Sequence, residues 1–187
     1  MSLEYINRRE QKYFLHQGQT KNGKAKYYFS MNHDDSCLDN VPKGYEIYEN
    51  PDAQVFLCRK KEQLITNAEK QMVVFAVKKN KKVKHFIVDV KGKYISIYIA
   101  HSLLSTDNIA HDWILQTIEA NAAKYLNFMA VMRFKLEDPI ERYFTAERFC
   151  SLGSIDDWIQ IGYVDHLEKL ASEFIKHLEH ETLYELH

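Results

Sequence analysis

Glycine is scarce in this chain, with six glycines among 187 residues, and phosphate-binding loops are built from glycine. It has no Gly-rich loop ending in Lys-Ser or Lys-Thr, no Gly-x-Gly-x-x-Gly fingerprint, no Gly-x-Ser-x-Gly elbow and no Cys-x-x-Cys pair. These patterns hold nucleotide phosphates, dinucleotides, a nucleophilic serine and a metal or redox pair, respectively. We therefore expect no cofactor, and we favour a protein that is not an enzyme.

Cysteines and long apolar runs are also scarce. Cys37, Cys58 and Cys150 are odd in number and lie far apart, which excludes a disulfide framework and favours a reducing compartment. The longest apolar runs, residues 72–77 and 95–100, are far shorter than the ~20 residues that a membrane span requires. Because the N-terminal residues lack a signal-peptide pattern as well, we expect a soluble cytoplasmic protein without a membrane partner.

Neither sign of charge is in excess, since 25 Lys and Arg face 26 Asp and Glu. The distribution along the chain is uneven. Residues 1–100 hold 18 basic and 11 acidic residues, a balance of +7, whereas residues 101–187 hold 7 and 15, a balance of −8. Two interpretations stay open: the two halves attract one another in the fold, or the basic half presents a docking face.

Turn residues between alternating segments predict a series of antiparallel hairpins. Asn22-Gly23 is typical of a type I′ turn, which requires a positive φ at both positions. Asn50-Pro51-Asp52-Ala53 and Lys91-Gly92 mark two further turns, and a turn at residues 137–141 follows a segment with one wholly apolar face. The expected strand pairs are residues 16–21 with 24–30, 45–49 with 54–59, 83–90 with 94–100, and 126–136 with 142–150.

Helical patterns separate the hairpins and close the chain. Thr66 and Glu69 form a capping box at the start of a helix expected to end near Lys78. We also expect helices over residues 105–125, briefly after Ser154, and from Asp165, where Asp165 and Glu168 would form a second capping pair.

The predicted class is α+β, with antiparallel hairpins forming a sheet and helices packed between the hairpins and at the C-terminus. Residues 1–62 are expected to form a small two-hairpin module and residues 63–187 the main α+β domain, unless the chain is one continuous domain.

Basic and aromatic residues interleave in the first half of the chain. Cations contact phosphates and exposed rings stack on unpaired bases, so this pattern predicts a non-enzymatic binding protein whose partner is an acidic protein or nucleic acid. The alternative is that the aromatic residues are core and that lysines at a helix C-terminus only favour its dipole. The candidate binding residues are Lys24, Lys26, Tyr28, Arg59, Lys60, Lys61, Lys79, Lys81, Lys82 and Lys84.

Nine histidines permit a metal hypothesis. On a helix, Glu173, His177 and His180 would share one face, which predicts a metal site and a metal-dependent hydrolase as the alternative function. Solvated or packed histidines explain the same residues. The run His33-Asp34-Asp35 offers another set of ligands for a divalent ion, although Asp is common at turns. A third hypothesis is self-association through an open edge of the long alternating strands.

Four segments, residues 27–30, 41–57, 153–158 and 177–186, resemble a family of uncharacterised soluble bacterial proteins. The resemblance implies a bacterial source and a soluble protein. It implies no activity and transfers no catalytic residue.

Overall fold

A computed structural model of the chain describes residues 2–100, 126–152 and 155–186. The helix expected over residues 105–125 lies outside the described residues. The chain divides into two compact units. The described part of the first unit comprises residues 2–61 and 126–127, and that of the second comprises residues 62–100, 128–152 and 155–186.

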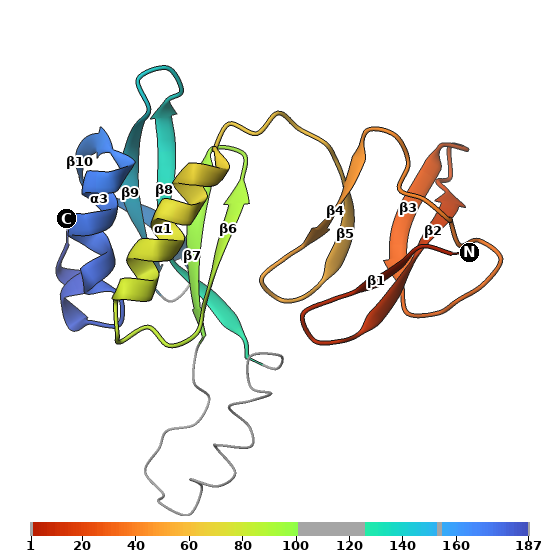
Figure 1. Ribbon diagram of the computed structural model, residues 1–187, viewed down its shortest axis with the longest axis horizontal. Coiled ribbons are helices and arrows are strands. Elements are labelled where there is room, and N and C mark those ends of the chain that lie inside the picture. The colour runs from red at the N-terminus through yellow and green to blue at the C-terminus, as the bar shows by residue number, and fades with distance from the viewer. Residues whose placement is uncertain (1, 101–125, 153–154, 187) are drawn as a thin grey trace, which may run out of the picture. The chain divides into compact units, whose positions relative to one another are not determined.

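The first unit is built from short antiparallel strands (Figure 1). A three-stranded sheet has the order β1 (Glu4–Ile6), β2 (Lys12–Gln19), β3 (Ala25–Ser30). A separate hairpin pairs β4 (Tyr45–Glu49) with β5 (Val55–Arg59). The two hairpins expected in this part of the sequence are therefore confirmed.

Three hairpin turns of the first unit, residues 7–11, 20–24 and 50–54, share one backbone geometry. In each turn the amide of the first residue donates to the carbonyl of the fifth, and the amide of the fourth donates to the carbonyl of the first. The fourth residue has a positive φ in every case: Glu10 at 58°, Gly23 at 73° and Ala53 at 62°. Since Asn22 has no positive φ, the expected type I′ turn is wrong, and a type I turn followed by a bulge residue takes its place.

The second unit is a five-stranded antiparallel sheet covered on one face by two helices (Figure 1). The helices are α1 (Asn67–Lys79) and α3 (Leu167–Phe174), and two short 3-10 helices follow, η2 (Ile175–His177) and η3 (Glu181–Glu185). No helix of the described chain is long and apolar enough to cross a membrane. The strand order is β10 (Ile155–His166), β9 (Tyr143–Leu152), β8 (Phe128–Asp138), β7 (Tyr94–Ala100), β6 (Phe86–Lys91).

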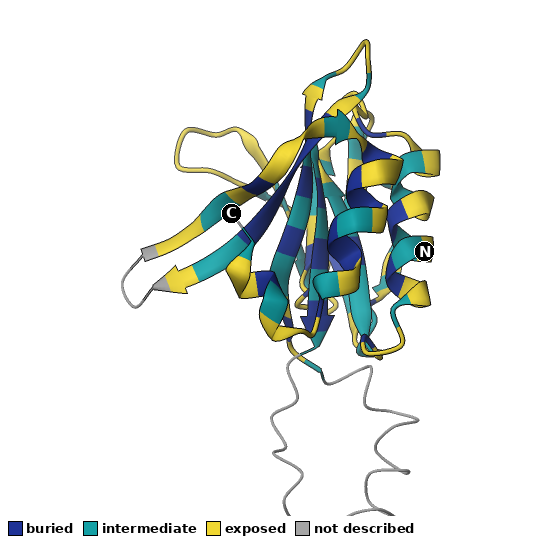
Figure 2. Ribbon diagram, turned by 90° about the vertical axis from the view of Figure 1, so that its left-hand side faces the viewer, coloured by how far each residue is buried: buried dark blue, intermediate teal, exposed yellow. Residues whose placement is uncertain are grey.

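The core of the second unit lies between the sheet and the helices. Ile95 and Ile97 of β7 and Phe134 of β8 are fully buried on this face, opposite Val73 of α1 and Leu170 of α3. Figure 2 shows the buried residues in dark blue along the strands and along the inner faces of the helices. The alternation of apolar and polar residues over 94–100 therefore corresponds to a buried and a more exposed face of the sheet.

Helix α1 begins as expected. The Thr66 side chain accepts a hydrogen bond from the Glu69 amide at 3.2 Å, and the Thr66 amide donates to the Glu69 carboxylate at 2.8 Å. Both bonds of the capping box are present, so this prediction is confirmed.

The predicted α+β class is wrong, because the structure is mostly β, with 46% strand and 19% helix among the residues described. Strand β10 occupies the residues for which a short helix after Ser154 was expected. It pairs with β9 from Ile155 opposite Leu152 to His166 opposite Tyr143, and the far end of this hairpin extends past the other strands (Figure 2). Pairing with β9 outweighs the helix-capping pattern that Ser154 and the acidic residues after it present.

The C-terminal helix is shorter than expected at both ends. His166 occupies the position before its first turn and makes no side-chain capping bond, so the expected Asp165 and Glu168 capping pair is wrong. The α-helix ends at Phe174, and the side-chain amide of Asn80 donates to the carbonyls of Ile175 at 2.9 Å and Leu178 at 3.2 Å in the segment that follows. A side chain distant in sequence thus binds carbonyls at the end of the helical segment.

Candidate functional site

The strongest concentration of unpaired charge lies at the C-terminal end of α1. Lys78 and Lys79 are in its last turn, and Lys81, Lys82 and Lys84 follow before β6. We call residues 78–84 the lysine segment. All five lysines are exposed, and none forms an ion pair with another described residue.

The backbone of the lysine segment is fixed by its two uncharged residues. Asn80 donates its backbone amide to Val77 at 3.0 Å, accepts the Val83 amide at 3.1 Å, and holds η2 through its side chain. Val83 is buried in the core of the second unit. Because Asn80 and Val83 point inward, the lysines between and around them point to solvent. Lys176 on η2 adds another exposed lysine to the element that Asn80 holds.

The candidate residues of the first unit do not form one face. Lys24 and Lys26 are exposed on and beside β3, and Arg59 is exposed at the end of β5, followed by Lys60 and Lys61. Neighbouring residues of a strand point to opposite faces. Tyr27 packs on Tyr45, the register partner of Arg59, so Lys26 points away from the side on which Arg59 lies.

Tyr28 is 40% exposed, yet one face of its ring is already covered. The imidazole of His16 stacks on it with ring centroids 5.1 Å apart and planes 9° apart. A base could stack only on the opposite face of the ring, so its role in binding stays a prediction.

The three residues of the metal alternative do not converge. The Glu173 carboxylate accepts a hydrogen bond from the Tyr163 hydroxyl at 2.7 Å. His177 Nδ1 and His180 Nδ1 lie 2.7 and 2.8 Å from the Thr182 hydroxyl. Burial, together with the charges of Lys176 and His180, lowers the pKa of His177. Since the α-helix ends at Phe174, the spacing that would align all three on one helical face is not realised, and the metal site stays a prediction.

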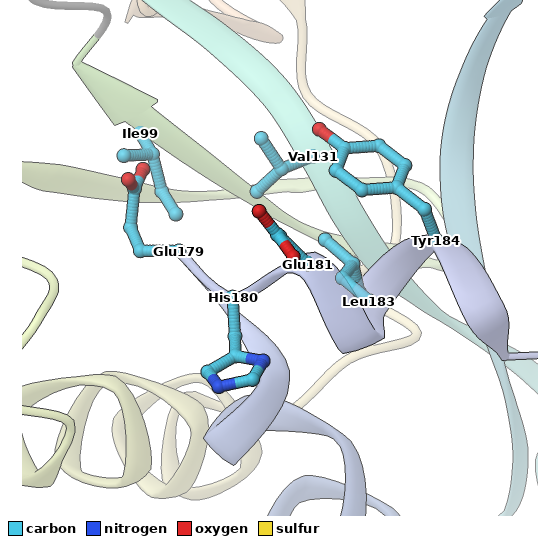
Figure 3. Close-up of a pocket in the computed structure, with 7 residues that line it drawn as sticks. All are labelled: Ile99, Val131, Glu179, His180, Glu181, Leu183 and Tyr184. Carbon is cyan, nitrogen blue, oxygen red and sulfur yellow. The ribbon is translucent and has the colours of Figure 1, made fainter.

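A small cavity lies beside His180, between the C-terminal turn and the edges of β7 and β8 (Figure 3). Its volume is about 260 Å³, below the roughly 300–1,000 Å³ of most ligand pockets. The carboxylates of Glu179 and Glu181 face it, whereas the His180 ring points away from them in Figure 3. The cavity is therefore acidic and does not extend the lysine surface. The remaining lining residues are Ile99, Val131, Leu183 and Tyr184.

Sequence reasoning missed a cation on the sheet face opposite the helices. The Arg133 guanidinium lies 4.3 Å from the ring centroid of Tyr94 and 4.2 Å from that of Trp158. It also forms an ion pair with Glu147, which is 9% exposed. The charge of the Arg133 guanidinium is therefore neutralised, and aromatic rings cover both of its faces. We interpret Arg133 as a residue that stabilises the sheet by packing. No local signal connects these residues, because only strand register brings them together.

A second missed cluster lies in the first unit. His16, Asp34 and Cys37 place their potential ligand atoms within 4.8 Å of one another. The sequence singled out Asp34, but with His33 and Asp35. His16 has no other potential ligand near it in the sequence, so no local pattern joined it to Asp34 and Cys37.

Comparison with family models, with curated proteins and with solved structures gives no significant match to this chain.

Proposed function

We propose that this protein is a non-enzymatic binding protein that docks nucleic acid through the lysine segment. The observation that carries the proposal is the exposure of Lys78, Lys79, Lys81, Lys82 and Lys84 within seven residues, none of them ion-paired within the described chain. Free ammonium groups at this density attract a polyanion, and binding gains free energy from release of its counterions.

The pattern of ion pairs argues against the alternative that the two halves of the chain neutralise one another. Glu147, Glu137 and Asp165 of the acidic half are engaged by cations of that same half. The pair between Glu69 and Arg142 joins the halves, but its acid comes from the basic half and its base from the acidic half. No described carboxylate pairs with the lysine segment, and this favours an external partner for its positive charge.

The cytoplasm is the proposed location. Cys37, Cys58 and Cys150 are free thiols, as in proteins of reducing compartments.

Salt-dependent binding to nucleic acid is the first test. Fluorescence anisotropy with labelled single-stranded and double-stranded DNA and RNA, repeated across a salt series, is expected to show affinity that falls steeply with salt. The variant Lys79→Gln/Lys81→Gln/Lys82→Gln should reduce the slope of log K against log salt by about 2–3 on duplex DNA, since each lost phosphate contact removes about 0.9.

The matched control is Lys21→Gln/Lys43→Gln/Lys91→Gln, which removes the same charge from exposed lysines elsewhere. It should leave the slope close to that of the unchanged protein. Equal losses in the two variants, or binding that is absent or insensitive to salt, would overturn the proposal. Binding to polyglutamate without binding to nucleic acid would replace nucleic acid by an acidic protein as the partner.

A further inference from the structure

The first unit holds a cluster that nucleic-acid binding does not use. His16 on β2 is 1% exposed, and the loop after β3 passes directly beside it. Cys37 forms an isolated antiparallel bridge with His16, and the next amide, that of Leu38, donates to the Leu15 carbonyl at 2.7 Å. The backbone therefore holds this part of the loop in a defined position against β2.

The distances within the cluster match those between ligands of one ion. His16 Nδ1 lies 3.3 Å from Asp34 Oδ1 and 3.8 Å from Cys37 Sγ. Zinc bonds of 2.0–2.3 Å at tetrahedral angles separate ligand atoms by about 3.3–3.8 Å. The Asp34 and Cys37 donor atoms thus lie at nearly zinc-ligand spacing from His16 Nδ1, and all three donor atoms lie within 4.8 Å of one another.

The hydrogen bond made by Nε2 of His16 makes Nδ1 the ring nitrogen that could bind a metal. Nε2 lies 3.0 Å from the carbonyl of Asn32, which can only accept, so Nε2 carries a hydrogen. In metal sites the second nitrogen of a ligating histidine commonly donates to a backbone carbonyl in this way, which fixes the tautomer and the ring.

The Nδ1 side of His16 faces two oxygen atoms. The Ser36 hydroxyl lies 2.8 Å from Nδ1 and 2.6 Å from Asp34 Oδ1. A cation beside Nδ1 would be attracted by both oxygen atoms, and a carboxylate oxygen is a ligand that zinc accepts.

We propose that His16 Nδ1, Asp34 Oδ1 and Cys37 Sγ bind a zinc ion, with the Ser36 hydroxyl or a water as the fourth ligand. The mixed nitrogen, oxygen and sulfur set suits zinc, whereas magnesium and calcium take oxygen ligands.

A bound ion would add stability to the described part of the first unit. The buried apolar side chains among its described residues are few: Phe14, Leu15, Ala53 and Val55. Where little apolar surface is buried, a metal ion can supply part of the folding free energy. An ion joining residues 16 and 37 closes the long loop onto the sheet and adds its binding free energy to folding.

Zinc and cobalt titration of the full chain, purified without a tag, tests the site. One equivalent of cobalt is expected to give a sulfur-to-cobalt charge-transfer band, and zinc should displace it and raise the melting temperature. Cys37→Ser should abolish the band, and Cys37→Ser and Asp34→Asn should each weaken zinc binding more than about tenfold.

Matched controls are Cys58→Ser, which removes another thiol of the same unit, and Asp35→Asn, which removes the neighbouring exposed carboxylate. Both should bind cobalt and zinc as the unchanged protein does. Circular dichroism establishes that Cys37→Ser and Asp34→Asn are folded. The proposal is overturned if the unchanged protein shows no cobalt band, if folded Cys37→Ser binds as tightly, or if only His177→Ala/His180→Ala abolishes binding.

Discussion

Gly162 shows how a single residue determines the route of β10. Its φ is 71°, and it lies at the irregularity where the register with β9 shifts, between Ile161 and Asp165. A Cβ at this position would overlap the ring of Phe174, which is 3% exposed at the end of α3. Glycine is required here both by backbone conformation and by close packing.

Gly162→Ala is therefore expected to lower the free energy of unfolding by about 3 kcal/mol, the sum of the left-handed conformation and the overlap with Phe174. Gly92→Ala is the matched control, because φ is 60° there and an added Cβ meets nothing within 4 Å. It should cost about 1 kcal/mol. Urea unfolding followed by circular dichroism measures both, and equal losses would contradict the assigned contact.

Glu69 joins the start of α1 to the turn between β8 and β9. Its carboxylate accepts from Arg142 Nε at 2.9 Å and from the Thr66 amide. Burial raises the pKa of Glu69, but the hydrogen bonds from Arg142 and Thr66 outweigh burial and leave it below its ordinary value. A lowered folded-state pKa means that the carboxylate stabilises the fold above the ordinary pKa, and that this contribution is lost as pH falls through the folded-state pKa.

Glu69→Gln keeps an acceptor for the capping box and removes the charge. We expect it to lower the free energy of unfolding by about 1 kcal/mol at neutral pH, with the difference shrinking below about pH 4. The measurement is urea unfolding at a series of pH values, with the exposed Glu62→Gln as control. A difference that stays constant down to about pH 3 would show that the ion pair does not stabilise the fold.

At the scale of elements, Arg133 connects four strands of the large sheet. It is the register partner of Glu147 on β9, and its guanidinium packs between Tyr94 of β7 and Trp158 of β10. Removing it alone would leave the Glu147 carboxylate buried without its partner.

Arg133→Met is expected to lower the free energy of unfolding by about 2 kcal/mol, because both side chains of the pair keep some exposure to solvent. Arg133→Met/Glu147→Leu should recover most of that loss, since no buried charge is then left unpaired. Denaturant unfolding of the two variants compares them directly. A double variant no more stable than the single one would show that the unpaired Glu147 carboxylate does not cause the loss.

Local elements followed from the sequence where a short-range rule sufficed. The turns at Asn50 and Gly92 set the hairpins around them, and the Thr66 capping box set the start of α1. Strand β10 did not follow, because residues after Ser154 satisfy a helix-capping pattern and a strand pattern equally well. Pairing with β9 decides between the two patterns, and that pairing is not a local property.

At the scale of the whole chain, the net charges of +7 and −8 on the two halves do not tell which charges pair with one another. The acidic half supplies cations to several of its own carboxylates, such as Arg133 to Glu147 and Lys169 to Asp165. The lysine segment stays unpaired within the described chain. Candidate binding residues that are contiguous in the sequence, such as those of the lysine segment, lie together in the structure. Lys26 and Arg59 are distant in the sequence and point to different sides.

The sequence by itself determined four of the hairpins, the start of the first helix and the lysine segment, because turn chemistry, capping and contiguous charge act over a few residues. Only the tertiary structure decided the contact of Asn80 with the segment after α3, and the clusters around Arg133 and His16. Their members come from separate strands and loops, and strand register and loop packing alone bring such residues within contact distance. The residues of the proposed binding surface are thus neighbours in the sequence, whereas those of the proposed zinc site are brought together only by the fold.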